Sequence, residues 1–155
     1  MEFSAASRAE FEALLTRYPT KEAALLPTLW LVQRQEGWIS ESSMEYVAGL
    51  LGISPVKVFS VVSFYTMYYT RPMGRHVIQV CRNLSCSLLG ARELIAHIED
   101  RIGARVGETT ADGRYSLLTV ECLGSCGTAP MMQVNDDYHE NLTRERVDAL
   151  LASMK

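Results

Sequence analysis

Apolar residues recur at helical spacing from residue 4 to about residue 69, which predicts four short helices. The first should end before Pro19, because proline cannot continue a helix. The second is expected over residues 21–36, with Trp30 among its inward-facing side chains. Pro27 should either bend this second helix or lie in its first turn.

Capping residues delimit the third and fourth helices. Ser40 is a candidate N-cap for the third, and Gly52 should end it. Ser54 as N-cap and Pro55 at the first helical position then begin the fourth, whose apolar residues include Phe64. The four helices together predict a small bundle-like unit.

The pattern changes at residues 71–75, where Pro72 and Gly74 interrupt the helical periodicity. We therefore expect two domains, an N-terminal helical bundle over 1–72 and a second domain over 73–155.

The second domain has the pattern of an α/β layer. Expected strands cover 76–80, 115–121 and 131–134, a short partner strand lies near 138–141, and helices cover 90–103 and 144–154. This βαββα order includes a crossover helix, which places two neighbouring strands parallel in one sheet.

The only four cysteines of the chain follow the first two of these strands. Cys81 and Cys86 form one pair, and Cys122 and Cys126 form the other. The carboxyl ends of neighbouring parallel strands meet at one sheet edge, so all four sulfurs can converge there if the two strands are neighbours. Two short-spaced pairs of thiolates can close a four-coordinate metal site or a cluster site.

Thiolates are soft ligands that favour zinc, copper(I) or iron-sulfur clusters. The spacing alone does not exclude zinc. The small and polar residues of both loops favour a cluster, because their backbone N–H groups can approach sulfur, and Arg82 could offer positive charge to the anion. Disulfides are the less favoured use of these cysteines if the compartment is reducing.

Composition narrows the function classes. A net charge of −3 and scattered basic residues argue against a nucleic-acid partner. The amino terminus lacks the order of a secretory signal, and the apolar stretches fall short of the ~18 residues that span a bilayer. We expect a soluble cytoplasmic protein that can dock on a membrane complex without inserting.

Two loop sequences are specific enough to indicate a family. Residues 80–86 (VCRNLSC) and 120–135 (VECLGSCGTAPMMQVN) resemble the cluster-binding loops of the thioredoxin-like [2Fe-2S] subunit, the E-type subunit, of NADH-quinone oxidoreductase, or respiratory complex I. The resemblance extends to 35–39 (QEGWI), 61–65 (VVSFY) and 112–113 (DG), so it covers nearly the whole chain.

This resemblance implies a fold and a site. The fold would be a thioredoxin-like [2Fe-2S] domain of α/β class, preceded by a small N-terminal helical bundle. One [2Fe-2S] cluster would be held by Cys81, Cys86, Cys122 and Cys126, and no ligand position departs from the family pattern.

The resemblance also implies partners. In the family, the subunit packs against a larger flavoprotein, of F type, that carries FMN and the NADH site, alongside other subunits of a peripheral arm attached to the inner membrane. The chain itself lacks a G-x-G-x-x-G turn and a P-loop, so nothing in it indicates NADH binding or independent catalysis. We expect it to act as a subunit of an NADH dehydrogenase that exchanges single electrons with the partner's FMN.

Other functions remain open at this point. Similar subunits serve NAD-coupled hydrogenases and formate dehydrogenases. Residues 44–59 resemble a helix-turn-helix, as in a zinc-binding regulator, but Lys57 is the only cation of the supposed recognition helix. Dithiol catalysis is disfavoured because the chain has no C-x-x-C pair.

Several residues have an ordinary structural interpretation. His76, His97 and His139 are not expected to be ligands, and the aromatic group of Phe64 to Tyr69 is expected to be core rather than a docking patch. Pro130 stands where thioredoxin-like folds place a cis-proline, but the general preference of X–Pro bonds favours trans.

Overall fold

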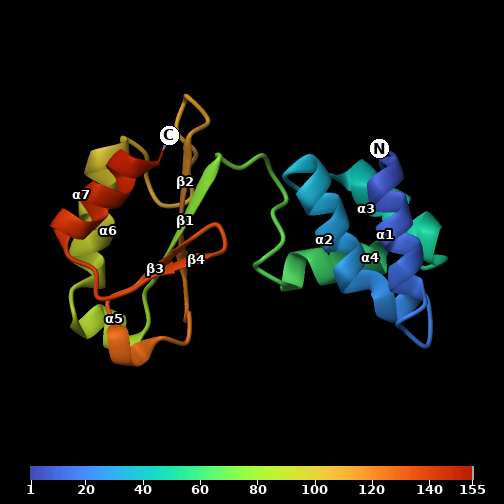
Figure 1. Ribbon diagram of the computed structural model, residues 1–155, viewed down its shortest axis with the longest axis horizontal. Helices are drawn as coiled ribbons and strands as arrows, with labels where there is room; N and C mark the ends of the chain where they lie inside the picture. The colour runs from blue at the N-terminus through green and yellow to red at the C-terminus, as the bar shows by residue number, and fades with distance from the viewer. Residues whose placement is uncertain (155) are drawn as a thin grey trace. The chain divides into compact units, whose positions relative to one another are not determined.

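The computed structural model describes residues 1–154 and divides the chain into two compact units, Met1–Pro72 and Met73–Lys155. Figure 1 shows an all-helical first unit and a second unit that combines helices with a sheet.

The first unit contains the four predicted helices and one additional 3-10 turn. Its elements are α1 (Ala5–Leu15), the 3-10 turn η1 (Glu22–Ala24), α2 (Leu25–Glu36), α3 (Glu41–Leu51) and α4 (Pro55–Phe64). Their inward faces form one core, which includes Phe11, Leu29, Val47 and Val58.

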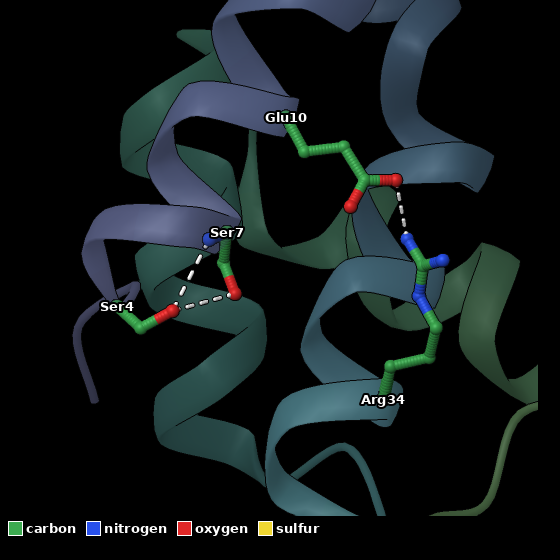
Figure 2. Close-up of polar contacts among 4 residues, drawn as sticks. All are labelled: Ser4, Ser7, Glu10 and Arg34. Carbon is green, nitrogen blue, oxygen red and sulfur yellow. Dashed lines mark hydrogen bonds and ion pairs between the residues drawn. The ribbon is translucent and has the colours of Figure 1, made fainter.

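Side-chain caps fix where these helices begin. Ser4 accepts a hydrogen bond from the backbone N–H of Ser7 at 3.1 Å, as Figure 2 shows, and Ser40 caps α3 in the same way. Figure 2 also shows Arg34 of α2 paired with Glu10 of α1 at 2.6 Å. Both side chains of this pair are more than half exposed, so it adds at most about 1 kcal/mol to stability.

Two predictions for the first unit were wrong. Trp30 is not an inward residue, since 36% of it is exposed and its ring packs beside Tyr68. The buried stripe of α2 runs through Leu25, Leu29 and Val32, and position 30 lies off that stripe at 3.6 residues per turn. Phe64 is 75% exposed at the last position of α4, so the aromatic group is only partly core.

The remaining details agree closely with the sequence. Pro27 lies in the first turn of α2, and Gly52 ends α3 in the left-handed conformation. Pro55 is the first residue of α4, but the Ser54 side chain makes no capping hydrogen bond.

The second unit contains a four-stranded mixed sheet. Its elements are β1 (His76–Cys81), α5 (Leu84–Leu88), α6 (Ala91–Ile102), β2 (Tyr115–Val120), the 3-10 turn η2 (Cys126–Thr128), β3 (Met132–Val134), β4 (Asp137–His139) and α7 (Arg144–Ser153). The strand order is β2-β1-β3-β4, with β1 and β2 parallel and the other neighbours antiparallel. The predicted parallel pair is therefore confirmed.

One face of this sheet is covered by α6 and α7, which lie side by side (Figure 1). Ile98 of α6 and Val147 of α7 are fully buried against Ile78 and Leu117 of the central strands. Burial of these aliphatic side chains, at roughly 1.5–3 kcal/mol each, holds the helices on the sheet.

Two features of the second unit differ from the sequence predictions. Helix α5 was not anticipated. The Ala129–Pro130 peptide bond is cis, so the expectation of a trans bond was wrong. The trans preference of X–Pro bonds is only about 0.5–1 kcal/mol, which tertiary contacts can outweigh.

Candidate metal centre

The parallel pairing of β1 and β2 brings both cysteine loops to one edge of the sheet. Cys81, the last residue of β1, is opposite Val120, the last residue of β2, and Cys122 follows two residues later. The backbone N–H of Arg82 donates to the Val120 carbonyl at 3.0 Å, so the two segments still run together as they leave the sheet.

The first cysteine pair is buried. Cys81 is 4% exposed at the end of β1, and Cys86 is 3% exposed on α5. The side chain of Asn83 accepts from the N–H of Leu84 and begins α5, which turns Cys86 back toward the sheet edge. Both sulfurs pack with Met131 in a small apolar cluster.

The second cysteine pair lies in an exposed loop. Cys122 and Cys126 are both solvent-exposed, and Leu123 between them packs against the apolar cluster around Cys81 and Cys86. Gly124 has a φ of +77°, a conformation that side chains disfavour, and its N–H donates to Cys122 Sγ at 3.3 Å.

The electrostatics of Cys86 show that three sulfurs share one neighbourhood. Burial raises the pKa of the Cys86 thiol, and a hydrogen bond with Cys81 and the charges of Cys81 and Cys126 raise it further. The backbone N–H of Met131 acts in the opposite direction, because it can donate to the thiolate. The structure thus brings Cys81, Cys86 and Cys126 together, and Cys122 is attached to the same place through its loop.

This donor set fits a [2Fe-2S] cluster. All four cysteines are free thiols, so none is committed to a disulfide. Their crowding disfavours several thiolates without a cation, while backbone N–H groups of Gly124 and Met131 already point at sulfur. Over residues 1–154, no three His, Cys, Asp or Glu side chains lie close enough together to hold a single metal ion, so the cysteines share one region of the fold without forming a preassembled site for one ion.

Other candidate residues have structural partners of their own. Arg82, which could have offered charge to the cluster, forms an ion pair with Glu121. His97 contacts Asp148 at 2.9 Å, between α6 and α7, while His76 and His139 lie on β1 and β4. The Asp148 contact gives His97 a structural role, and the exclusion of the three histidines as ligands stays a prediction.

Two contributors to the site were missed in the sequence. Asn83 could have been found, because an Asn directly before apolar residues at helical spacing, here Leu84 and Leu88, is a helix-start signal. Glu140, whose carboxylate accepts hydrogen bonds from Ser125 and Thr128 in the second loop, gives no signal in the sequence. It lies more than ten residues from that loop and meets it only through the β3–β4 hairpin.

A membrane span was not found. Within residues 1–154, no helix combines the length and the apolar character needed to cross a bilayer.

Comparison with known proteins gives a consistent family assignment. Residues 11–155 match the family described as thioredoxin-like [2Fe-2S] ferredoxin. A similar protein is an E-type subunit of NADH-quinone oxidoreductase from Rhizobium meliloti, 47% identical over 148 residues that cover 96% of this chain and 88% of the relative. "NADH-quinone oxidoreductase subunit 2" of Thermus thermophilus is 46% identical over 93% of this chain and 81% of its own length.

Solved structures support the fold. A chain of an NAD+-reducing [NiFe]-hydrogenase in the H2-reduced state superimposes with a TM-score of 0.74 at 22% identity, over 84% of this chain and 22% of that chain. The air-oxidised form of such an enzyme gives a TM-score of 0.73. At this identity the likeness establishes the fold alone.

Proposed function

The chain belongs to the thioredoxin-like [2Fe-2S] ferredoxin family, and from this we propose that it is the electron-transfer subunit of an NADH-quinone oxidoreductase. In this proposal, Cys81, Cys86, Cys122 and Cys126 hold one [2Fe-2S] cluster. The chain exchanges single electrons with a partner flavoprotein that carries FMN and oxidises NADH, and it has no catalytic activity alone.

The observation that carries this proposal is the combination of relatives and site. Relatives named as subunits of NADH-quinone oxidoreductase match this chain at 46–47% identity along nearly its whole length. In the same chain, all four cysteines lie on two loops that leave one sheet edge. The sequence likeness supports the choice of host complex, and the shared sheet edge supports the four cysteines as the proposed ligands.

Each loop would contribute differently to the bound cluster. A bound cluster supplies a one-electron acceptor, whose reduction adds negative charge. Cys81 and Cys86 are buried and would keep water away from their part of the site, whereas Cys122 and Cys126 lie in an exposed loop next to solvent. The N–H groups of Gly124 and Met131 donate to sulfur and favour the more negative, reduced state.

A flavoprotein partner is proposed because the sequence contains no motif for binding NADH. Hydride transfer from NADH needs a nucleotide site and a flavin, and no dinucleotide-binding motif is present in the 155 residues. We assign those groups to the flavoprotein partner. The assembled complex would place this chain in a peripheral arm on the cytoplasmic side of the inner membrane.

Reduction by NADH tests the proposal. The cluster-loaded chain should stay oxidised when NADH is added alone, and its visible absorption should bleach when the FMN-containing flavoprotein is also present. Bleaching by NADH alone would overturn the assignment of the NADH site to a partner. No bleaching with the flavoprotein and NADH together would overturn the electron-transfer role.

One alternative host has a specific observation in its favour. The superimposed structures are NAD+-reducing hydrogenases, where an equivalent subunit could serve a diaphorase unit. The 22% identity of that match is far below the 47% identity of the quinone oxidoreductase relative, so we favour the quinone oxidoreductase. The same assay with the two candidate flavoproteins, compared by rate, distinguishes the hosts.

A further inference from the structure

Polar contacts hold the loop of the second cysteine pair in place, in addition to the packing of Leu123 against the apolar cluster. Cys122 and Cys126 are exposed, in contrast to the buried first pair. The hydroxyl of Tyr138 donates to the Leu123 carbonyl at 3.0 Å, and the N–H of Asn141 donates to the Thr128 carbonyl at 2.7 Å. The segment that follows β3 therefore supports this loop along its length.

Glu140 contacts the same loop through its charged carboxylate. Its Oε1 accepts from Thr128 Oγ1 at 2.6 Å and also from Ser125 Oγ. The hydroxyl oxygens of Ser125 and Thr128 lie 2.7 Å apart, so a single carboxylate oxygen can accept a hydrogen bond from each. Ser125 immediately precedes Cys126 and Thr128 follows it by two residues, so the contacts bracket the cysteine on both sides.

The backbone that carries this carboxylate is also held in place. Arg146 of α7 donates to the carbonyls of Glu140 and Asn141, at 3.2 Å and 2.8 Å, which holds the segment against the helix. The hydrogen bonds from Ser125 and Thr128 also lower the pKa of the Glu140 carboxyl, so it is ionised at neutral pH. A negative charge is thus kept beside the loop that carries Cys126.

We propose that Glu140 is a positioning residue for the iron-sulfur site, which acts through Ser125 and Thr128 to set the place of the Cys126 sulfur. The proposal rests on the proposed function in that a [2Fe-2S] cluster is bound by the four cysteines. It has a second consequence, because reduction adds negative charge to the cluster and a fixed carboxylate nearby opposes that step. Glu140 should therefore slow cluster loss and lower the reduction potential.

Variants at one position separate these two effects. Glu140→Gln removes the charge but keeps a carbonyl oxygen for the hydroxyls, whereas Glu140→Ala removes both. Asp100→Asn is the matched control, since it removes one exposed carboxylate from α6 that makes no hydrogen bond or ion pair with residues 1–154. All are made in the full chain, and circular dichroism of the apo forms checks that each folds.

Two measurements are made on the anaerobically reconstituted proteins: the rate of iron loss to a ferrous chelator and the midpoint potential in a redox titration. Glu140→Ala should lose iron about tenfold faster than wild type, because it removes a residue that holds a ligand loop in place. The rate of iron loss from Glu140→Gln should lie between the rates of wild type and Glu140→Ala. Both variants should have a higher midpoint potential than wild type. Asp100→Asn should change neither quantity.

A second set of variants tests the route through the hydroxyls. Ser125→Ala combined with Thr128→Val should lose iron as fast as Glu140→Ala, and adding Glu140→Ala to that pair should give no further acceleration. If the triple variant instead loses iron faster than either Glu140→Ala or the double variant, Glu140 does not act through these two hydroxyls. The proposal is overturned if Glu140→Ala has the same rate of iron loss and the same midpoint potential as Asp100→Asn. A wild-type chain that binds no [2Fe-2S] cluster would instead overturn the proposed function, and the proposal with it.

Discussion

Cys81 ends β1 directly opposite Val120, the last residue of the parallel strand β2. This register places the exits of both strands at one level, so that the loops carrying the two cysteine pairs begin side by side. A shift of one residue would turn the side chain of Cys81 to the other face of the sheet. The strand register is therefore a structural condition for the site.

Removal of single cysteines should abolish stable cluster binding. Cys81→Ala and Cys126→Ala each leave one iron with a single protein thiolate, so we expect less than half of the wild-type iron after anaerobic reconstitution. Ser87→Ala, an exposed position on α5 beside Cys86, is the control and should retain full iron content. Full iron content in either cysteine variant would remove that residue from the ligand set.

Gly74 should be intolerant of any side chain. A Cβ at this position would lie 2.6 Å from the carbonyl carbon of Tyr115 and 2.9 Å from the backbone nitrogen of Ser116. Both are strand backbone that cannot move aside, and the Gly74 N–H donates to Ser116 Oγ at 2.7 Å. We expect Gly74→Ala to lower the free energy of unfolding by about 1–3 kcal/mol in urea titrations followed by circular dichroism.

A glycine-to-alanine change in the first unit provides the control. Gly49 lies within α3, and a Cβ there would have no neighbour within 4 Å. Gly49→Ala should raise the free energy of unfolding by about 0.5–1 kcal/mol, because alanine loses less backbone entropy in a helix. If the two substitutions act in the same direction, the close approach at Gly74 is not what determines the result.

Packing of α6 on the sheet should dominate the stability of the second unit. Ile98 is fully buried, so Ile98→Ala should cost about 2–5 kcal/mol. Leu88→Ala removes a side chain that is 76% exposed and should change stability by less than about 0.5 kcal/mol. Thermal unfolding of the apo proteins measures both, and equal losses would contradict the burial of Ile98.

Alkaline pH should destabilise the helical unit through Tyr68. Burial, and then the charge of Tyr65, raise the pKa of the Tyr68 phenol from 10.0 to about 12, and its hydroxyl donates to the Leu26 carbonyl at 2.9 Å. The raised pKa means that the fold favours the protonated form. This contribution to stability is complete below pH 10 and is lost as the pH rises toward 12.

Unfolding measured between pH 8 and 12, about two units on either side of the ordinary tyrosine pKa, tests this point. Tyr68→Phe should remove part of the decrease in the free energy of unfolding at alkaline pH. Tyr138→Phe is the control and should leave that decrease in place, because this phenol is half-exposed and belongs to the other unit. Identical pH profiles for wild type and Tyr68→Phe would contradict the assignment.

Local signals explain why so much of the fold could be predicted. Ser40 and Gly52 both act as caps for α3, and Gly90 and Gly103 flank α6 in the left-handed conformation. Such signals depend on a few neighbouring residues, so the sequence alone reveals them. Convergence of the two cysteine loops was expected only on the condition that their strands are neighbours, and the parallel pairing of β1 and β2 meets that condition.

Features that depend on contacts between distant segments could not be predicted. The position of Trp30 depends on which side of α2 the other helices cover, and Glu140 reaches Ser125 only because β3 and β4 form a hairpin beside the second loop. The resemblance to thioredoxin-like folds pointed to a cis peptide bond before Pro130, but the local preference favours trans and alone gives the wrong isomer. In each case the outcome depends on tertiary contacts that the local sequence pattern does not contain.

The four sulfurs at this sheet edge are proposed to hold a binuclear iron-sulfur centre, on which the other functional proposals depend. The most direct test is iron, sulfide and zinc analysis of the anaerobically purified full chain, together with electron paramagnetic resonance after reduction. We predict about two irons and two sulfides per chain and a rhombic signal in the reduced protein. One zinc per chain with no sulfide and no such signal would contradict the account.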